Sequence, residues 1–268
     1  MRNKHWLVSS LLFLLSVTVA LGSCKNPAAP VAPDAETASA PTIAALVGTW
    51  KMSSTSTDDG ASISTQDICK FSADGSFVRE SIETSTPSSG SPTTTYTWYK
   101  GTIGISGDNL TMATAEVAQG SASEPSSWIT VDMKTTSTAA LIGNKLYMQG
   151  VAKAQGSNTG IVGTWLTETY SKYPTRTTPV EQSEKAIFSF SSEKTFSVKV
   201  YESSTSTYPS DPSTSKTGTY VLNSNGSITL TYTGATTSST FFYKVSGAYL
   251  IQGSVGETSV DANVYIKQ

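Results

Sequence analysis

Side chains that commonly perform catalysis or bind metals are scarce in this chain. The only histidine is His5, and the only cysteines are Cys24 and Cys69. His5 lies in an N-terminal segment that we expect to be removed, so the mature chain has no imidazole for a Ser-His-Asp or Cys-His nucleophile, a general base or a zinc site. Cys69 is expected to be a buried apolar residue. The sequence therefore predicts a non-enzymatic protein without cofactor or metal.

Carboxylates are the remaining candidates for acid–base chemistry. They are scattered near turns and on polar strand positions, at Asp67, Asp74, Glu80, Glu83, Glu116 and Asp132, and no pair recurs in the second half of the chain. A glycosidase needs two carboxylates facing each other across a cleft, and none is expected here. Asp58-Asp59-Gly60 lacks the spacing of a calcium loop and is expected to be a turn.

The first 23 residues have the pattern of a signal peptide. Arg2 and Lys4 precede an apolar run at 7–21, which is shorter than the roughly 20 residues of a membrane span. The run ends in Leu21-Gly22-Ser23-Cys24, which resembles the lipobox of bacterial lipoproteins: an aliphatic residue, two small residues and the cysteine.

This resemblance implies cleavage before Cys24, a diacylglycerol thioether on its sulfur and acylation of the new amine. Several acyl chains on one residue would make a durable membrane anchor. Residue 25 is Lys rather than the Asp that retains enteric lipoproteins at the inner membrane, so the resemblance favours the outer membrane of the cell envelope.

Residues 24–43 are expected to form a flexible tether. The segment has prolines at 27, 30, 33 and 41 and few large apolar side chains, so it cannot bury enough surface to offset ordering. Without Arg2 and Lys4 the chain has 16 basic and 20 acidic side chains, a net charge of -4. With no basic stripe, nucleic acid is not an expected partner.

The rest of the chain contains an internal repeat. Residues 46–50 (LVGTW) return at 161–165 (IVGTW), and three more landmarks recur in the same order: 68–77 with 187–196, 107–112 with 225–230, and 143–150 with 247–253. We therefore expect two copies of one module, at 44–153 and 161–268, joined by a linker at 154–160.

Apolar residues alternate with polar ones in both modules, as in half-buried strands. Phe196, Val198 and Val200 are one example, and Gly- and Asp-containing turns separate the runs. The expected class is all-β. A meander of seven or eight strands leaves two exposed edges unless it closes, so we expect two tandem small up-and-down antiparallel β-barrels.

A Gly-Thr-Trp on the first strand followed by about eight strands in hairpin order resembles bacterial lipocalin-like domains. The motif occurs at Gly48 and Trp50 and again at Gly163 and Trp165. The resemblance implies that the two tryptophans close the barrel bottoms, which is a structural role.

The leading functional hypothesis is a binding protein that holds a small apolar or amphipathic ligand in a barrel. Candidate lining residues are Ile129, Val131, Met133, Phe241, Tyr243 and Val245. Arg79 aligns with Val198 and so could aim a charge into the first barrel; the favoured alternative is a bulge that leaves Arg79 in water. A second hypothesis is a structural or surface-exposed interaction protein with solid barrels, in which the Ser/Thr-rich segments 83–95 and 202–216 contact partners.

Overall fold

The computed structural model describes residues 36–58, 60–120, 122–173, 180–253, 259, 261 and 264–268. The expected signal peptide, Cys24 and the tether up to residue 35 lie outside the described residues. The prediction of an all-β protein is confirmed: the described part has 17 strands in one sheet and a single turn of helix, α1 (Ile43–Leu46). In this part no helix is long and apolar enough to cross a membrane.

The strands of the first half are mostly long. They are β1 (Gly48–Asp58), β2 (Ala61–Phe71), β3 (Ser76–Thr86), β4 (Thr93–Ser106), β5 (Asn109–Gln119), β6 (Ile129–Thr138), β7 (Ala140–Ile142), β8 (Lys145–Tyr147) and β9 (Val151–Ala154). The second half contains β10 (Gly163–Tyr173), β11 (Val180–Phe190), β12 (Thr195–Ser203), β13 (Thr214–Leu222), β14 (Ser227–Tyr232), β15 (Ser238–Ser246), β16 (Tyr249–Gln252) and β17 (Tyr265–Lys267).

Eight strands form a closed antiparallel barrel. Consecutive pairs run from β10 to β16, and β9 closes the ring by pairing with both β16 and β10. Alternation sets the two faces of each strand: in β12, Phe196, Val198 and Val200 are buried while Ser197, Lys199 and Tyr201 between them are not. We refer to β9–β16 as the closed barrel.

The remaining strands form the N-terminal unit. Strands β1 to β6 pair in sequence order, and β17 lies between β1 and β8, which in turn pairs with β7. The last strand of each half therefore belongs to the other half. The exchanged strands β9 and β17 take equivalent positions beside the tryptophan of the half that they join. Trp50 is opposite Lys267 of β17, and Trp165 is opposite Ala154 of β9.

The pairings inside the two halves also correspond. Phe77 is opposite Gly101, and Phe196 is opposite Gly218. Neither glycine has room for a side chain: a Cβ would lie 2.9 Å from the Phe77 ring at Gly101 and 2.7 Å from the Phe196 ring at Gly218. Each aromatic ring thus covers the glycine of the neighbouring strand.

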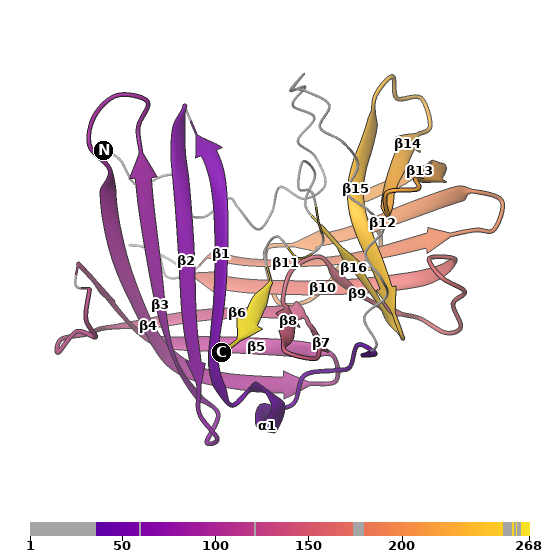
Figure 1. Cartoon of the computed structure of the whole chain (residues 1–268). Helices are drawn as coiled ribbons and strands as arrows, with labels where there is room; N and C mark the ends of the chain where they lie inside the picture. The colour runs from indigo at the N-terminus through magenta and orange to yellow at the C-terminus, as the bar shows by residue number, and fades with distance from the viewer. Residues whose placement is uncertain are drawn as a thin grey trace.

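The halves are further joined through β6 and β10. Thr169 to Lys172 of β10 pair with Ser137 to Lys134 of β6, so the sheet runs on from one half into the other (Figure 1). A third hydrophobic cluster fills the junction, made of Ala38, Ala140, Ile142, Tyr147, Val151, Tyr249, Ile251 and Val264.

These observations correct the expected domain boundaries. The halves are not two separate tandem barrels at 44–153 and 161–268, because β9 completes the second half and β17 completes the first. Residues 36–43 are not part of a free tether either: Ser39 pairs with Leu141, and Ala38 is 8% exposed. Prolines dominate the segment only up to residue 33, and the apolar side chains after them pack against the sheet.

Candidate ligand site

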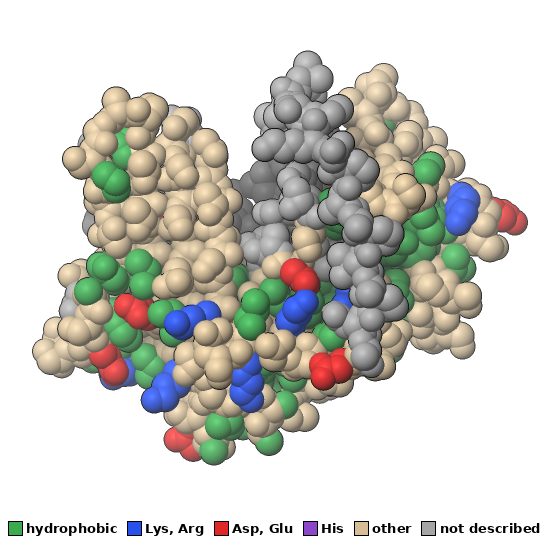
Figure 2. Space-filling model, in the orientation of Figure 1, with side chains coloured by type: hydrophobic (Ala, Val, Ile, Leu, Met, Phe, Trp, Pro, Cys, Tyr) green, Lys and Arg blue, Asp and Glu red, His purple; other side chains and the backbone are tan. Residues whose placement is uncertain are grey.

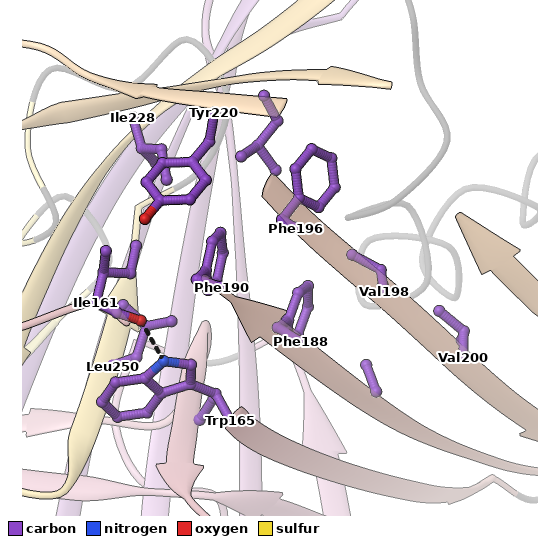
Figure 3. Packing of buried hydrophobic residues seen from close by; sticks show 13 residues of the cluster. Ile161, Trp165, Phe188, Phe190, Phe196, Val198, Val200, Tyr220, Ile228 and Leu250 are labelled. Atoms are coloured by element: carbon purple, nitrogen blue, oxygen red, sulfur yellow. Dashed lines mark hydrogen bonds between the residues drawn. The ribbon is translucent and has the colours of Figure 1, made fainter. Parts of the chain in front are cut away.

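Aromatic and aliphatic side chains pack together in the interior of the closed barrel (Figure 3). Trp165 is fully buried, and its indole Nε1 donates a hydrogen bond of 2.8 Å to the carbonyl oxygen of Ile161. The rings of Phe190 and Tyr220 meet edge to face with centroids 5.3 Å apart. Packing of this kind stabilises the fold and fixes the barrel's base.

Several apolar residues that pack against this core are only partly buried. Tyr232, Phe241, Tyr243 and Val245 pack on the core without being enclosed by it. Phe241 is opposite the fully buried Ile228, which places its ring on the inner face. The Lys216 ammonium lies 5.3 Å from the centre of the Tyr232 ring. An apolar surface with a cation beside it suits a ligand that has an apolar body and a polar group.

Two carboxylates lie opposite each other on β11 and β12. Glu184 is opposite Glu202. Two residues along each strand, and on the same face, the buried Ala186 is opposite the buried Val200. Burial raises the pKa of Glu184 above its usual value, and the charge of Glu202 raises it further. Burial, with Glu168 and Glu184 nearby, also raises the pKa of Tyr208 to about 12.

The base of the N-terminal unit repeats the arrangement of the closed barrel. Trp50 is 1% exposed and donates from Nε1 to the carbonyl oxygen of Leu46 at 2.6 Å. Both tryptophans therefore bond to the residue four positions earlier, and both are preceded by a glycine at positive φ, Gly48 at 127° and Gly163 at 149°. The Gly-x-Trp motif is the turn and anchor of each half.

A charged pair lies above Trp50 on the inner face. Arg79 of β3 donates to the Asp67 carboxylate of β2 through Nε at 3.3 Å and Nη2 at 2.8 Å. Tyr265 of the exchanged strand β17 donates to the same carboxylate at 3.1 Å, and the guanidinium lies 5.2 Å from the centre of the Tyr99 ring. Asp67 is 2% exposed, so its charge needs these partners.

The favoured alternative for Arg79, a bulge that turns it into water, is wrong. The β2–β3 pairing runs without a shift, with Arg79 opposite Cys69, so Arg79 falls on the same face as the buried Phe77 and Ser81. The side chain of Arg79 is nevertheless 32% exposed. The guanidinium therefore lies on the inner face of the unit and is still partly exposed to solvent.

Burial dominates the electrostatics around this pair. It raises the pKa of the Cys69 thiol to about 12, which leaves the thiol protonated and unreactive at neutral pH. Burial also raises the pKa of Tyr265, although Arg79 lowers it in part, so the phenol stays a proton donor to Asp67. Among the described residues, no three potential ligands of the His, Cys, Asp and Glu types are grouped to hold a metal ion.

The candidate residues of β6 are not gathered into a site. Ile129 is 68% exposed at the start of the strand, which corrects its expected place in a barrel lining, and Val131 and Met133 are only partly buried. These three residues precede the part of β6 that pairs with β10, Lys134 to Ser137. Of the expected lining residues, Phe241, Tyr243 and Val245 lie together against a core, and Ile129, Val131 and Met133 do not.

Sequence reasoning did not single out Tyr99 or Tyr265 of the charged cluster, and it named Asp67 only as one of the scattered carboxylates. Asp67 and Tyr99 lie in segments in which inward and outward residues alternate. Each is two residues from a residue of the inner face, Cys69 or Gly101, so both could have been placed on that face from the sequence. No sequence signal placed Tyr265 in this cluster. Its strand β17 is last in the second half of the sequence but pairs with strands of the first half.

Comparison with known protein families matches residues 161–251 to the lipocalin-like domain. Residues 161–251 are therefore similar to a lipocalin-like domain. The matched range covers β10 to β16, and β9, from outside that range, closes the barrel. A search of curated proteins gave no match, and a search of solved structures gave none.

Proposed function

We propose that this chain is a lipid-anchored protein of the bacterial cell envelope whose lipocalin-like domain binds a small amphipathic ligand. The observation that supports binding is the group of Tyr232, Phe241, Tyr243 and Val245, which pack against the barrel core and are only partly buried. A ligand that covered these apolar side chains would remove more of their surface from water. Lys216 beside Tyr232 would pair with an anionic end of the ligand.

The test uses the chain starting at residue 24 with Cys24→Ser, titrated with an environment-sensitive fluorescent fatty acid. We expect saturable binding that Phe241→Lys weakens about tenfold or more, since a charge would replace an apolar contact of about 1.5 to 3 kcal/mol. Val221→Lys is the matched control, because Val221 is 59% exposed on the outer face of β13, another strand of the same barrel. Equal binding by both variants would place the probe elsewhere.

Anchoring rests on the lipobox resemblance at Leu21 to Cys24. Cells producing the chain should incorporate labelled palmitate into it, and Cys24→Ser should abolish incorporation. The first half, with its own Gly-x-Trp anchor, is proposed to be a second, diverged lipocalin-like unit. Lys25 favours the outer membrane as the site of the anchor.

A second candidate is a structural surface protein without a ligand, and its support is the order of one Ser/Thr-rich loop. Segment 202–216 does not extend freely: Ser183 Oγ donates to the carbonyl oxygen of Thr205 at 2.7 Å, and Ser213 Oγ accepts from the Glu202 amide at 2.8 Å. A preformed polar loop suits contact with another macromolecule. Absence of probe binding would favour this candidate.

A further inference from the structure

The inner face of the N-terminal unit is polar at positions where the inner face of the closed barrel is apolar. One row across three neighbouring strands shows the difference. Asp67 of β2 is opposite Ser81 of β3, and Ser81 is opposite Thr97 of β4. The equivalent row of the closed barrel consists of Ala186, Val200 and Thr214. A carboxylate and a hydroxyl in the N-terminal unit thus stand where the closed barrel has two apolar side chains.

The two hydroxyl groups of this row have no partner in the protein. Ser81 and Thr97 are each 3% exposed, and neither hydroxyl makes a hydrogen bond within the described part of the chain. In that same part, no side-chain nitrogen or oxygen that is shut off from solvent lacks a hydrogen-bond partner. The hydroxyl oxygens of Ser81 and Thr97 must therefore be reached by water, although the rest of each residue is buried.

The neighbouring row adds further groups that can form hydrogen bonds. Arg79 uses Nε and Nη2 to hold Asp67, and its Nη1 has no acceptor among the described residues. Tyr99 is opposite Arg79, is partly exposed, and makes no hydrogen bond through its phenol within the described residues. Unused donors and acceptors therefore gather on one face of β3 and β4, on Arg79, Ser81, Thr97 and Tyr99.

The charges on this face favour an uncharged molecule. Arg79 and Asp67 neutralise each other, and Glu83 lies on the same face, opposite Thr65 and Thr95. These are the only charged side chains that β2, β3 and β4 turn to this face, so two carboxylates stand against one guanidinium. An anion would be repelled by the carboxylates, and a cation beside Nη1 would be repelled by Arg79.

We propose that this face of the N-terminal unit binds a small uncharged ligand rich in hydroxyl groups, of the saccharide class. Each sugar hydroxyl can donate and accept, so it can replace the water at Ser81 and Thr97 and accept from Nη1 of Arg79. The ring of Tyr99 offers an apolar surface to the C–H groups of a sugar ring. This site lies apart from the ligand site proposed for the closed barrel, which is lined by apolar side chains.

The surface of the same lobe is also rich in uncharged polar groups. Among the described residues, Figure 2 shows no Lys, Arg, Asp or Glu on the upper part of the left-hand lobe in this view, and Figure 1 places β1 and β2 there. A neutral sugar would lose no favourable charge interaction on approaching such a surface.

An array of immobilised mono- and disaccharides tests the proposal. The protein is the chain starting at residue 24 with Cys24→Ser, and we expect saturable binding to at least one neutral sugar. Uronic acids on the same array should bind more weakly, because Asp67 and Glu83 would repel their carboxylates. Binding to no neutral sugar would mean that the hydroxyls hold water only, and stronger binding of uronic acids would rule out a neutral ligand.

Thr97→Val tests the position of the site. The valine has nearly the same shape and leaves no partner unpaired within the protein, so the urea midpoint of unfolding should not fall. Sugar binding should weaken about tenfold, as expected for one lost hydrogen bond. Thr102→Val is the matched control, because Thr102 is exposed on the outer face of the same strand. Equal sugar binding by the two variants would contradict the proposal.

The fluorescent fatty acid separates this proposal from the proposed function. Thr97→Val should bind the fatty acid as the unchanged chain does, whereas Phe241→Lys should weaken fatty-acid binding and leave sugar binding intact. Loss of both ligands in either variant would mean that the two sites are not independent and would overturn the proposal of a separate sugar site.

Discussion

At the scale of single residues, Cys69 shows how far burial changes a functional group. Its strand neighbour Arg79 carries a positive charge, which favours a thiolate, yet desolvation has the larger effect and the pKa rises to about 12 from 9.0. A lone thiol beside a guanidinium is therefore a core residue and not a nucleophile.

Alkaline pH should reveal this burial. The folded thiol keeps its proton between about pH 9 and 12, where the unfolded thiol has lost it, so the free energy of unfolding falls as pH rises through this range. The fall contributed by Cys69 is up to about 1.4 kcal/mol per pH unit. Urea denaturation at increasing alkaline pH measures it, and Cys69→Ala should show a shallower decline because the buried tyrosines still contribute. An identical decline in both proteins would argue against a buried thiol.

At the scale of elements, the exchange of β9 and β17 follows from size complementarity. Tyr265 of β17 packs in the N-terminal core with the small Cys69, whereas Ala152 of β9 packs in the other core with the large Phe188. Tyr265 and Ala152 hold equivalent positions, opposite Leu146 and Leu250. Each large residue therefore meets a small one only when the strands are exchanged.

This complementarity predicts a compensating pair of substitutions. Ala152→Tyr should destabilise the protein by about 1 to 3 kcal/mol, because a ring would be forced against Phe188. Adding Phe188→Cys should recover part of that loss, so a double-mutant cycle on the free energy of unfolding should give a favourable coupling. Additive effects would show that the two positions are independent.

The alternation of apolar and polar residues made the strands and their inner faces predictable from the sequence. The pairing between segments far apart in the sequence was not predictable. Phe241, Tyr243 and Val245 were placed correctly against a core because a hairpin fixes their register. The pairing of β6 with β10 depends on contacts between the halves and was not predicted, and Ile129, which lies outside that pairing, is exposed. The inward direction of Arg79 followed from parity, but Asp67 and Tyr265, which make its charge tolerable, are recognised only in three dimensions.

At the scale of the whole molecule, the two halves are one structure. The continuous sheet, the exchanged strands and the junction cluster around Tyr147 and Tyr249 tie each half to the other. Ion pairs reinforce the tie: Lys153 of β9 reaches Asp108 at 3.0 Å, and Lys145 of β8 reaches Asp261 at 2.7 Å. Cutting the chain at the linker would separate strands from the partners they complete.

The position of β17 also sets an order of assembly. Tyr265 leaves the ribosome after the residues of every earlier strand, whereas β9 is made before the barrel that it closes. The later-made half can therefore finish first, and the earlier-made half must wait with Asp67 lacking its tyrosine partner. A chain built this way stays incomplete until its last strand has been made.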